Sequence, residues 1–350
     1  MPEQPAKPSP NFLRSTDASS PPAPSEVLLH DELDPAGMTF DPELGRVGAI
    51  TTDVPGRRRL GQGLTVGAWV AIGWMVFVVL LAVLAKTGLL TWGDPQNSIA
   101  ACARKGPFAN EGGAAGHLLG CDSNGRDMIA RVALGAWTSL LVSVGAIAVG
   151  FIIGGGLGLV AGYFGGRIDT FLTATFNVML SVPAIIFALA LVAFLQGTGQ
   201  NSGTTALPDV LILIIAIGVV SIPLVGRIAR ASALSWGQRE FVLAARAQGA
   251  KNGRIMIREL LPNVAPALFS IALLGIAIAI VAEGTLAILG VGVKPPTPSW
   301  GNIIAVDRGE LFTSPHIVFE PSLMIFATVL ALNFLGDVVR SRFDVREAGI

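Results

Sequence analysis

A short polar segment between two long apolar runs has the clearest capacity for specific surface chemistry. Gln238 to Gln248 is rich in good helix formers and predicts a short helix, which Gly249 ends because glycine adopts positive φ at little cost. Four residues at positions i, i+3, i+4 and i+7 share one face of this helix: Phe241, Ala244, Ala245 and Gln248. That face is shallow and has one large side chain. It therefore either docks into a partner protein or lies on lipid headgroups, for which the arginines of the segment are suited.

A single carboxylate, Glu283, stands inside a long apolar run. An ionisable residue at membrane depth is a functional hypothesis by default, because burying a charge there is costly. Two interpretations of Glu283 remain open. Either it lines a transport path, or it lies near the outer end of its helix and is hydrogen-bonded to a neighbouring helix as a structural tie.

The two cysteines of the chain, Cys102 and Cys121, both fall in residues 86–131, between the first two apolar runs. If this loop lies on the outer, oxidising side of the membrane, a disulfide can form and persist there. Closing a loop of roughly 20 residues restricts the unfolded chain by about 3 kcal/mol, a model-dependent figure. The sequence therefore favours a disulfide, with two free thiols as the alternative.

Motifs of enzymatic chemistry are absent from the sequence. No G-x-x-x-x-G-K-[ST] phosphate loop occurs, so the chain does not itself bind ATP in that way. No G-x-S-x-G elbow and no H-E-x-x-H zinc motif occur, and the three histidines, His30, His117 and His316, lack metal-ligand spacing. We therefore expect a non-catalytic chain with no metal site and no cofactor of its own.

The elements that must position these residues are membrane helices. The chain is 52% hydrophobic and only 14% charged, whereas a soluble domain is nearer a quarter charged. A helix needs about 20 apolar residues to cross a hydrocarbon core about 30 Å thick. Six runs meet or approach this length: 64–85, 132–166, 170–195 with Pro183 inside, 210–226, 262–293 and 321–336. The predicted fold class is an all-α membrane protein with six transmembrane helices and one short helix between the fourth and the fifth.

Charge segregates along the sequence in a way that predicts orientation. Residues 1–56 are rich in proline and acidic side chains, which predicts a disordered acidic cytoplasmic tail. The segment 57–85 then opens with three arginines before the first span, so the N-terminus should be cytoplasmic. The segments after the fourth and sixth spans are again basic, while 197–207 has no basic residue. We expect a multi-pass cell-membrane protein with both termini in the cytoplasm and residues 86–131 outside.

Several stretches resemble one family of membrane proteins. Leu243-Ala244-Ala245-x3-Gly249-x11-Leu261-Pro262 is similar to the E-A-A-x3-G-x9-I-x-L-P signature of permease subunits of bacterial ATP-binding-cassette (ABC) importers. It departs from the signature at Leu243, where glutamate is usual, and at Glu259, where isoleucine is usual. Five more stretches resemble the C-type subunit of the dipeptide, oligopeptide and nickel branch: Asp122–Asp127, Gly158–Gly166, Arg239–Val242, Lys294–Asn302 and Asn333–Asp337. They cover roughly residues 120–346, in the family order.

This resemblance implies a type I importer permease, with a core of five spans over residues 132–346 and a coupling loop over 237–262. Such a subunit pairs with a homologous second permease in the lipid bilayer and receives substrate from an extracytoplasmic binding protein. Two cytoplasmic ATPase subunits bind the ATP and magnesium, and no nucleic acid takes part. The short helix would be seated in one ATPase with Phe241 as its anchor. The residues implied in this contact are Arg239, Glu240, Phe241, Ala244, Ala245, Gln248 and Gly249, with Arg239 and Arg246 at the rim.

The loop after the fifth span is stiff, because proline fixes φ and cannot continue a helix or a central strand. Pro295 and Pro296 lie in this loop, and Trp300 is expected to be an amphipathic anchor at the membrane interface. Two interpretations stay open: a docking surface for the binding protein, or a scaffold that only shapes the end of the fifth span.

Import of di- or oligopeptides is the function that the resemblance implies, and import of nickel or another small solute is the alternative within the family. A secondary transporter acting alone is a rival from another class. It should show inverted repeats and ionisable sites inside the membrane, and the sequence offers only Glu283. An intramembrane enzyme would need a nucleophile–base pair, which the spans lack.

Overall fold

The computed structural model describes residues 38–41, 46–49, 65–89, 97–108, 116–201 and 207–347. The chain divides into two units, Met1–Gly63 and Leu64–Ile350. In the first unit, β1 (Met38–Asp41) pairs antiparallel with β2 (Arg46–Ala49), with Met38 opposite Ala49. Both strands lie within residues 1–56, for which the sequence predicts a disordered tail. The other residues of that tail lie outside the described part of the chain.

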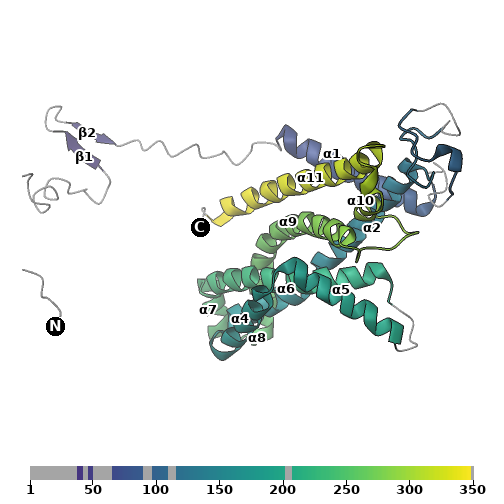
Figure 1. The fold of residues 1–350 in the computed structure, drawn as a ribbon. Helices are drawn as coiled ribbons and strands as arrows, with labels where there is room; N and C mark the ends of the chain where they lie inside the picture. Colours follow the sequence, from purple (N-terminus) through teal and green to yellow (C-terminus); the bar gives the residue numbers. More distant parts are fainter. Residues whose placement is uncertain are drawn as a thin grey trace, which may run out of the picture. The chain divides into compact units, whose positions relative to one another are not determined.

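The second unit is helical in its described residues (Figure 1). Its α-helices are α1 (Val66–Thr87), α2 (Met128–Val149), α3 (Gly155–Phe164), α4 (Gly166–Ser181), α5 (Ala184–Asn201), α6 (Asp209–Gly237), α7 (Glu240–Ala247), α8 (Asn252–Arg254), α9 (Leu261–Ile288), α10 (Trp300–Asp307) and α11 (His316–Glu347). Short 3-10 turns occupy Ala100–Cys102 and Arg308–Glu310, and π-helical turns occupy Gly150–Gly154 and Ile255–Leu260. The π turns join α2 to α3 and α8 to α9 without a break.

Five continuous helical segments are long and apolar enough to cross a membrane: Val66–Thr87, Met128–Phe164, Asp209–Gly237, Asn252–Ile288 and His316–Ser341. A sixth candidate is the pair Gly166–Ser181 and Ala184–Gly197, if this pair crosses as one span. The predicted fold class, an all-α membrane protein with six transmembrane helices and a short helix between the fourth and the fifth, is confirmed, with five continuous spans and the bent pair as the candidate for the sixth. Two segments have 37 residues each, about 55 Å of helix, so they extend well beyond the hydrocarbon core.

The third span is not the single helix that was predicted over 170–195. Helix α4 ends at Ser181, Val182 is extended (φ −89°, ψ 131°), and the axes of α4 and α5 differ by 89°. The cause is Pro183, which has no N–H to donate to α4 and which disfavours helical backbone at the residue before it. The chain therefore turns sharply inside a segment whose composition alone indicates a continuous span.

Close packing of α3 on α6 positions the helix that follows α6. A Cβ built on Gly158 would overlap the carbonyl oxygen of Gly226, and one on Gly154, in the π turn just before α3, would overlap that of Ile222. Only glycine permits this approach, as is common where membrane helices pack through small residues. The α3–α6 pair is thus a rigid base for α7, and α7 and α8 lie at one end of this unit while the segment before α2 lies at the other (Figure 1).

Candidate functional site

The boundaries of α7 follow from its sequence. Arg239 takes extended backbone (φ −74°, ψ 150°) and Glu240 opens the helix, where a negative charge interacts favourably with the helix dipole. At the other end Gly249 adopts φ 77°. Its N–H donates to Arg246 (2.9 Å), and the N–H of Ala250 donates to Ala245 (3.1 Å), which is the Schellman pattern. The short helix therefore has sharply fixed ends.

One buried residue holds α7 against the rest of the unit. Val242 is fully buried together with Ile255 and Leu260, in a cluster that α3, α6 and α9 also enter. Ala245, one turn after Val242, is half-buried in the same cluster. The predicted placement of Ala245 on the outward face is therefore wrong, because residues three apart share a face and Val242 occupies the inner one.

The outward face of α7 carries two large apolar side chains. Phe241 is 37% exposed and Leu243 is 52% exposed, while Ala244 and Gln248 are also exposed. The exposure of Leu243 was missed from the sequence, because the i, i+3, i+4, i+7 spacing does not include it. Because residues two apart do not share a helix face, Phe241 and Leu243 flank the exposed side of α7 from opposite edges.

The arginines of this segment stack on aromatic rings of the same chain. Arg239 lies over the ring of Trp236 at 5.3 Å, and Arg246 lies over that of Tyr163 at 5.0 Å. Phe241 also approaches Trp236, with 6.2 Å between ring centroids. Each cation–π contact contributes about 0.5–1 kcal/mol at an exposed site. These contacts orient the ends of α7, and Trp236 links Phe241 to the end of α6.

Glu283 is fully buried at the meeting point of three helices. Its two carboxylate oxygens accept hydrogen bonds from Ser299 (2.6 Å) and Ser139 (3.2 Å), so α9 is tied both to α2 and to the start of α10. The Ser139 hydroxyl in turn accepts the N–H of Trp300 at 3.1 Å. The carboxylate is thus fully engaged by its own chain.

Trp300 is not an exposed interface anchor, so this prediction is wrong. Its side chain is fully buried, and its indole N–H donates to the carbonyl oxygen of Val132 at 3.0 Å. Tryptophan can be buried at full depth where its N–H finds a partner, and the sequence does not reveal that partner. Pro295 and Pro296 are exposed. Of the three residues predicted in this loop, only these two remain available to another protein.

An apolar cavity of about 590 Å³ opens beside the break between α4 and α5. Residues from α2, α6, α9 and α11 complete its lining, which includes Ile147, Pro183, Ile185, Ile217, Ile278 and Asn333. None of its lining residues is charged. Glu283 is not among them, which favours the interpretation of Glu283 as a structural tie.

At the end opposite α7, two stretches, 97–108 and 116–127, form a structure that we call the disulfide cap. Cys102 and Cys121 form a disulfide, with 5.8 Å between their Cα atoms. His117 lies beside both sulfur atoms, but its Nδ1 pairs with the Asp127 carboxylate and the sulfur atoms are bonded to each other. A metal would need free thiolates, so this group does not form a metal site in the structure.

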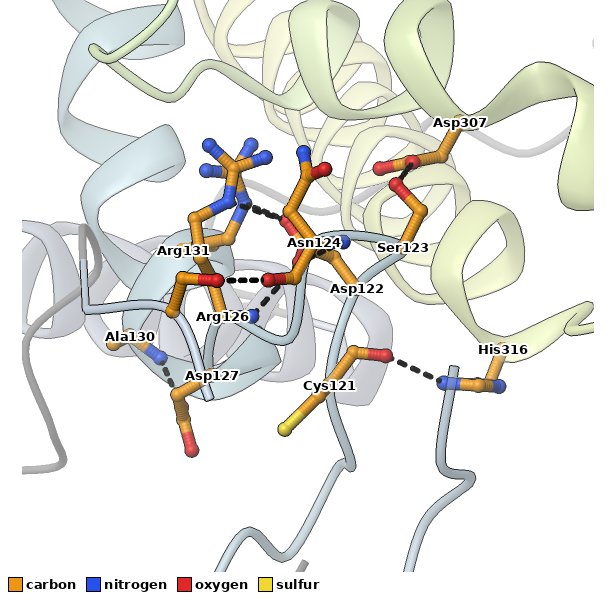
Figure 2. A network of polar contacts seen from close by, with 11 residues as sticks. Cys121, Asp122, Ser123, Asn124, Arg126, Asp127, Ala130, Arg131, Asp307 and His316 are labelled. Carbon is orange, nitrogen blue, oxygen red and sulfur yellow. Dashed lines mark hydrogen bonds and ion pairs between the residues drawn. The ribbon is translucent and has the colours of Figure 1, made fainter. Parts of the chain in front are cut away.

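Asp122 organises the cap where it meets α2 (Figure 2). One carboxylate oxygen accepts the N–H groups of Asn124 (2.9 Å) and Arg126 (2.8 Å). The other accepts Nε of Arg126 (2.7 Å) and forms an ion pair with Nε of the fully buried Arg131 (3.2 Å). Asp127 then caps α2 by accepting the N–H of Ala130 at 2.8 Å. This network was missed from the sequence, in which Arg131 was assigned to the loop.

The cap is also tied to the end of α10, to the loop that follows it and to the start of α11. Ser123 donates a hydrogen bond to Asp307, and His316 lies 3.3 Å from the carbonyl oxygen of Cys121 (Figure 2). Burial raises the pKa of the Asp307 carboxyl, and the hydrogen bond from Ser123 acts in the opposite direction. Arg104 pairs with Glu310 at 2.7 Å, and its hydrogen bond lowers the pKa of the Glu310 carboxyl. Segments about two hundred residues apart thus form one block.

Comparison with known proteins identifies the family. Residues 154–348 match the model of the binding-protein-dependent transport system inner membrane component family, which is more than half of the chain. The chain belongs to this family. The matched region contains α7, Glu283, the loop with Pro295 and Pro296, and all described lining residues of the cavity except Ile147, whereas the disulfide cap precedes it.

Curated relatives of this transport-system component extend the similarity toward the N-terminus. The dipeptide transport system permease protein DppC of Alkalihalophilus pseudofirmus is 34% identical over 281 residues, 80% of this chain and 85% of that protein. The glutathione transport system permease protein GsiD of Escherichia coli is 36% identical over 240 residues, 69% of this chain and 76% of that protein. Among solved structures, the MetNI methionine ABC transporter in inward-facing conformations is 22% identical, with a TM-score of 0.49 over 61% of this chain and 97% of that one.

Proposed function

We propose that this chain is the permease subunit of an ABC importer for di- and oligopeptides, in which it forms half of the translocation path. The observation that carries the proposal is the 34% identity to a dipeptide permease over 80% of the chain. A similar identity to a glutathione permease supports a peptide substrate as well. The subunit itself is non-catalytic.

The coupling step takes place at α7. Its outward face, with Phe241 and Leu243, seats in one of two cytoplasmic ATPase subunits, which bind the ATP and magnesium. The sharp ends of the helix and the Val242 contact support this, because a docking helix transmits force only if its own chain holds it firmly. In protein interfaces, one or two large apolar side chains commonly contribute most of the binding energy.

The apolar cavity beside the α4–α5 break forms this subunit's part of the path, and a homologous second permease covers it. Helix breaks in transporters expose backbone groups where a path runs through the membrane, which supports this assignment. A binding protein delivers the peptide at the end opposite α7, where Pro295 and Pro296 are exposed. In this proposal the chain lies in the plasma membrane with both termini in the cytoplasm, and the basic segments around α7 support that orientation.

The test is uptake by cells that lack this chain. A labelled dipeptide should no longer enter, and the wild-type chain should restore its entry. Uptake of a labelled amino acid by an unrelated carrier is the control for membrane integrity. Dipeptide uptake that persists while nickel uptake falls would contradict the peptide assignment and favour the alternative cargo. Restored uptake in the absence of the ATPase subunits would contradict the importer assignment.

A further inference from the structure

The disulfide cap and the loop between α10 and α11 form one braced surface. Arg104 is central to it: its side chain pairs with Glu310 at 2.7 Å, and its carbonyl oxygen accepts the Ser314 hydroxyl at 3.4 Å. The loop is further held by Arg308, which donates to the carbonyl oxygen of Ile288 at 3.1 Å. This surface therefore has a defined shape although it is made of loops.

Large apolar side chains project from this braced surface. Phe312 is 95% exposed and Phe108 is 74% exposed. Leu118 is 54% exposed and accepts the backbone N–H of Phe108 at 3.1 Å, so these two residues are neighbours. None of the three lies in a segment long and apolar enough to span the membrane. Exposed aromatic groups outside the spans are typical of a surface that another protein covers.

The backbone holds one of these aromatic residues in an unusual conformation. Phe108 has φ 59° and Arg104 has φ 62°, in the left-handed region that bulky residues rarely adopt. Such a conformation persists where the surrounding structure fixes it, and it is frequent at functional sites. The cap thus keeps Phe108 exposed at a local cost in free energy.

We propose that Phe108, Leu118 and Phe312 form a docking surface for the soluble binding protein on which this transport family depends. The proposal rests on the proposed function. Three observations favour this occupant. The surface lies at the end of the unit opposite α7, the family is binding-protein-dependent, and the paired Arg104 and Glu310 lie close in sequence to Phe108 and Phe312. An apolar centre with a charged rim is the usual anatomy of an interface between two soluble surfaces.

This docking surface extends the contact at Pro295 and Pro296 and replaces the one expected at Trp300. The residues that carry it lie in two separate regions of sequence, and one region precedes the family match at residue 154. The disulfide and the Arg104–Glu310 pair then have a functional consequence, because they bring Phe108 and Phe312 onto one rigid block.

Site-specific photo-crosslinking tests the surface directly. A benzophenone amino acid is placed at position 312 or 108 in the complete complex in proteoliposomes, with the binding protein added. The matched control is position 326, since Phe326 is 64% exposed in the middle of α11. We expect an adduct with the binding protein at 312 and 108 and none at 326. Adducts only with lipid, with the second permease or within this chain, or no adduct at all, would overturn the proposal.

A titration distinguishes failure of the surface from failure of the proposed function. ATPase activity of the complex is measured against binding-protein concentration for the wild type, Phe312→Ala and the control Phe326→Ala. Phe312→Ala should raise the half-maximal concentration at least fivefold, whereas Phe326→Ala should match the wild type both with and without binding protein. An unchanged half-maximal concentration in Phe312→Ala would overturn the docking surface. A wild-type complex with no stimulated activity would overturn the importer assignment and the surface with it.

Discussion

The two ends of the helical unit are built in opposite ways. The disulfide cap is held by a covalent bond, buried charges and hydrogen bonds between distant segments. The α7 segment is held by one buried valine and a few aromatic stacks. Substitutions in the cap should therefore impair folding and assembly, whereas substitutions on α7 should impair coupling in a complex that still assembles.

The largest effect is expected from Asp122→Ala. The change removes the acceptor of two backbone N–H groups and leaves the fully buried Arg131 without its carboxylate. Removing one partner of a buried ion pair typically costs about 3–5 kcal/mol. The yield and melting temperature of the detergent-purified complex should both fall. The control is Asn124→Ala at an exposed neighbour. A wild-type melting temperature in Asp122→Ala would contradict the claim that buried charges hold the cap.

The disulfide should give the next largest effect. Replacing both Cys102 and Cys121 by alanine should lower stability by about 3 kcal/mol, because the unfolded chain gains freedom. The direct measurement is thiol labelling of the unreduced wild-type protein, in which no thiol should react. Two reactive thiols would contradict both the disulfide and the location of the cap on the oxidising side.

Glu283 ties α9 to α2 and to the start of α10, so its substitution should affect assembly. Glu283→Leu leaves the hydroxyls of Ser139 and Ser299 without their acceptor and should destabilise assembly by about 1–3 kcal/mol. Glu283→Gln keeps an acceptor oxygen and should assemble and transport normally. Yield is measured by size-exclusion chromatography and transport in proteoliposomes. Lost transport in the glutamine variant at normal yield would show that Glu283 acts in the path.

The smallest effect belongs to the exposed pair of Arg104 and Glu310. Glu310→Gln should change the melting temperature little at pH 7, since the Arg104 side chain is 55% exposed and solvent screens the pair. The hydrogen bond from Arg104 lowers the folded-state pKa of Glu310, so the stabilisation is present above the unfolded pKa. It is lost as the pH falls through the lowered folded pKa. Melting temperatures of both proteins between pH 7 and pH 3 should therefore converge, and a difference that widens toward low pH would contradict this account.

Hydropathy and glycine patterns predicted the spans, the short helix and its end at Gly249, because these features depend on local sequence. The break at Pro183 could not be predicted, since membrane helices accommodate many prolines without breaking. The burial of Arg131 and Trp300 also escaped prediction, because each depends on a partner distant in sequence, Asp122 and Val132 respectively. The outward face of α7 was partly wrong for the same reason, as only the tertiary contact of Val242 decides which side faces inward.

The central claim is that α7 couples transport to ATP hydrolysis, and one measurement tests it most directly. Dipeptide uptake and ATP hydrolysis are measured together in proteoliposomes that contain the complete complex with Phe241→Ala. The account predicts a complex of normal yield in which the number of dipeptides imported per ATP falls at least tenfold. Normal uptake per ATP in Phe241→Ala would contradict the claim and favour an α7 that lies on lipid headgroups.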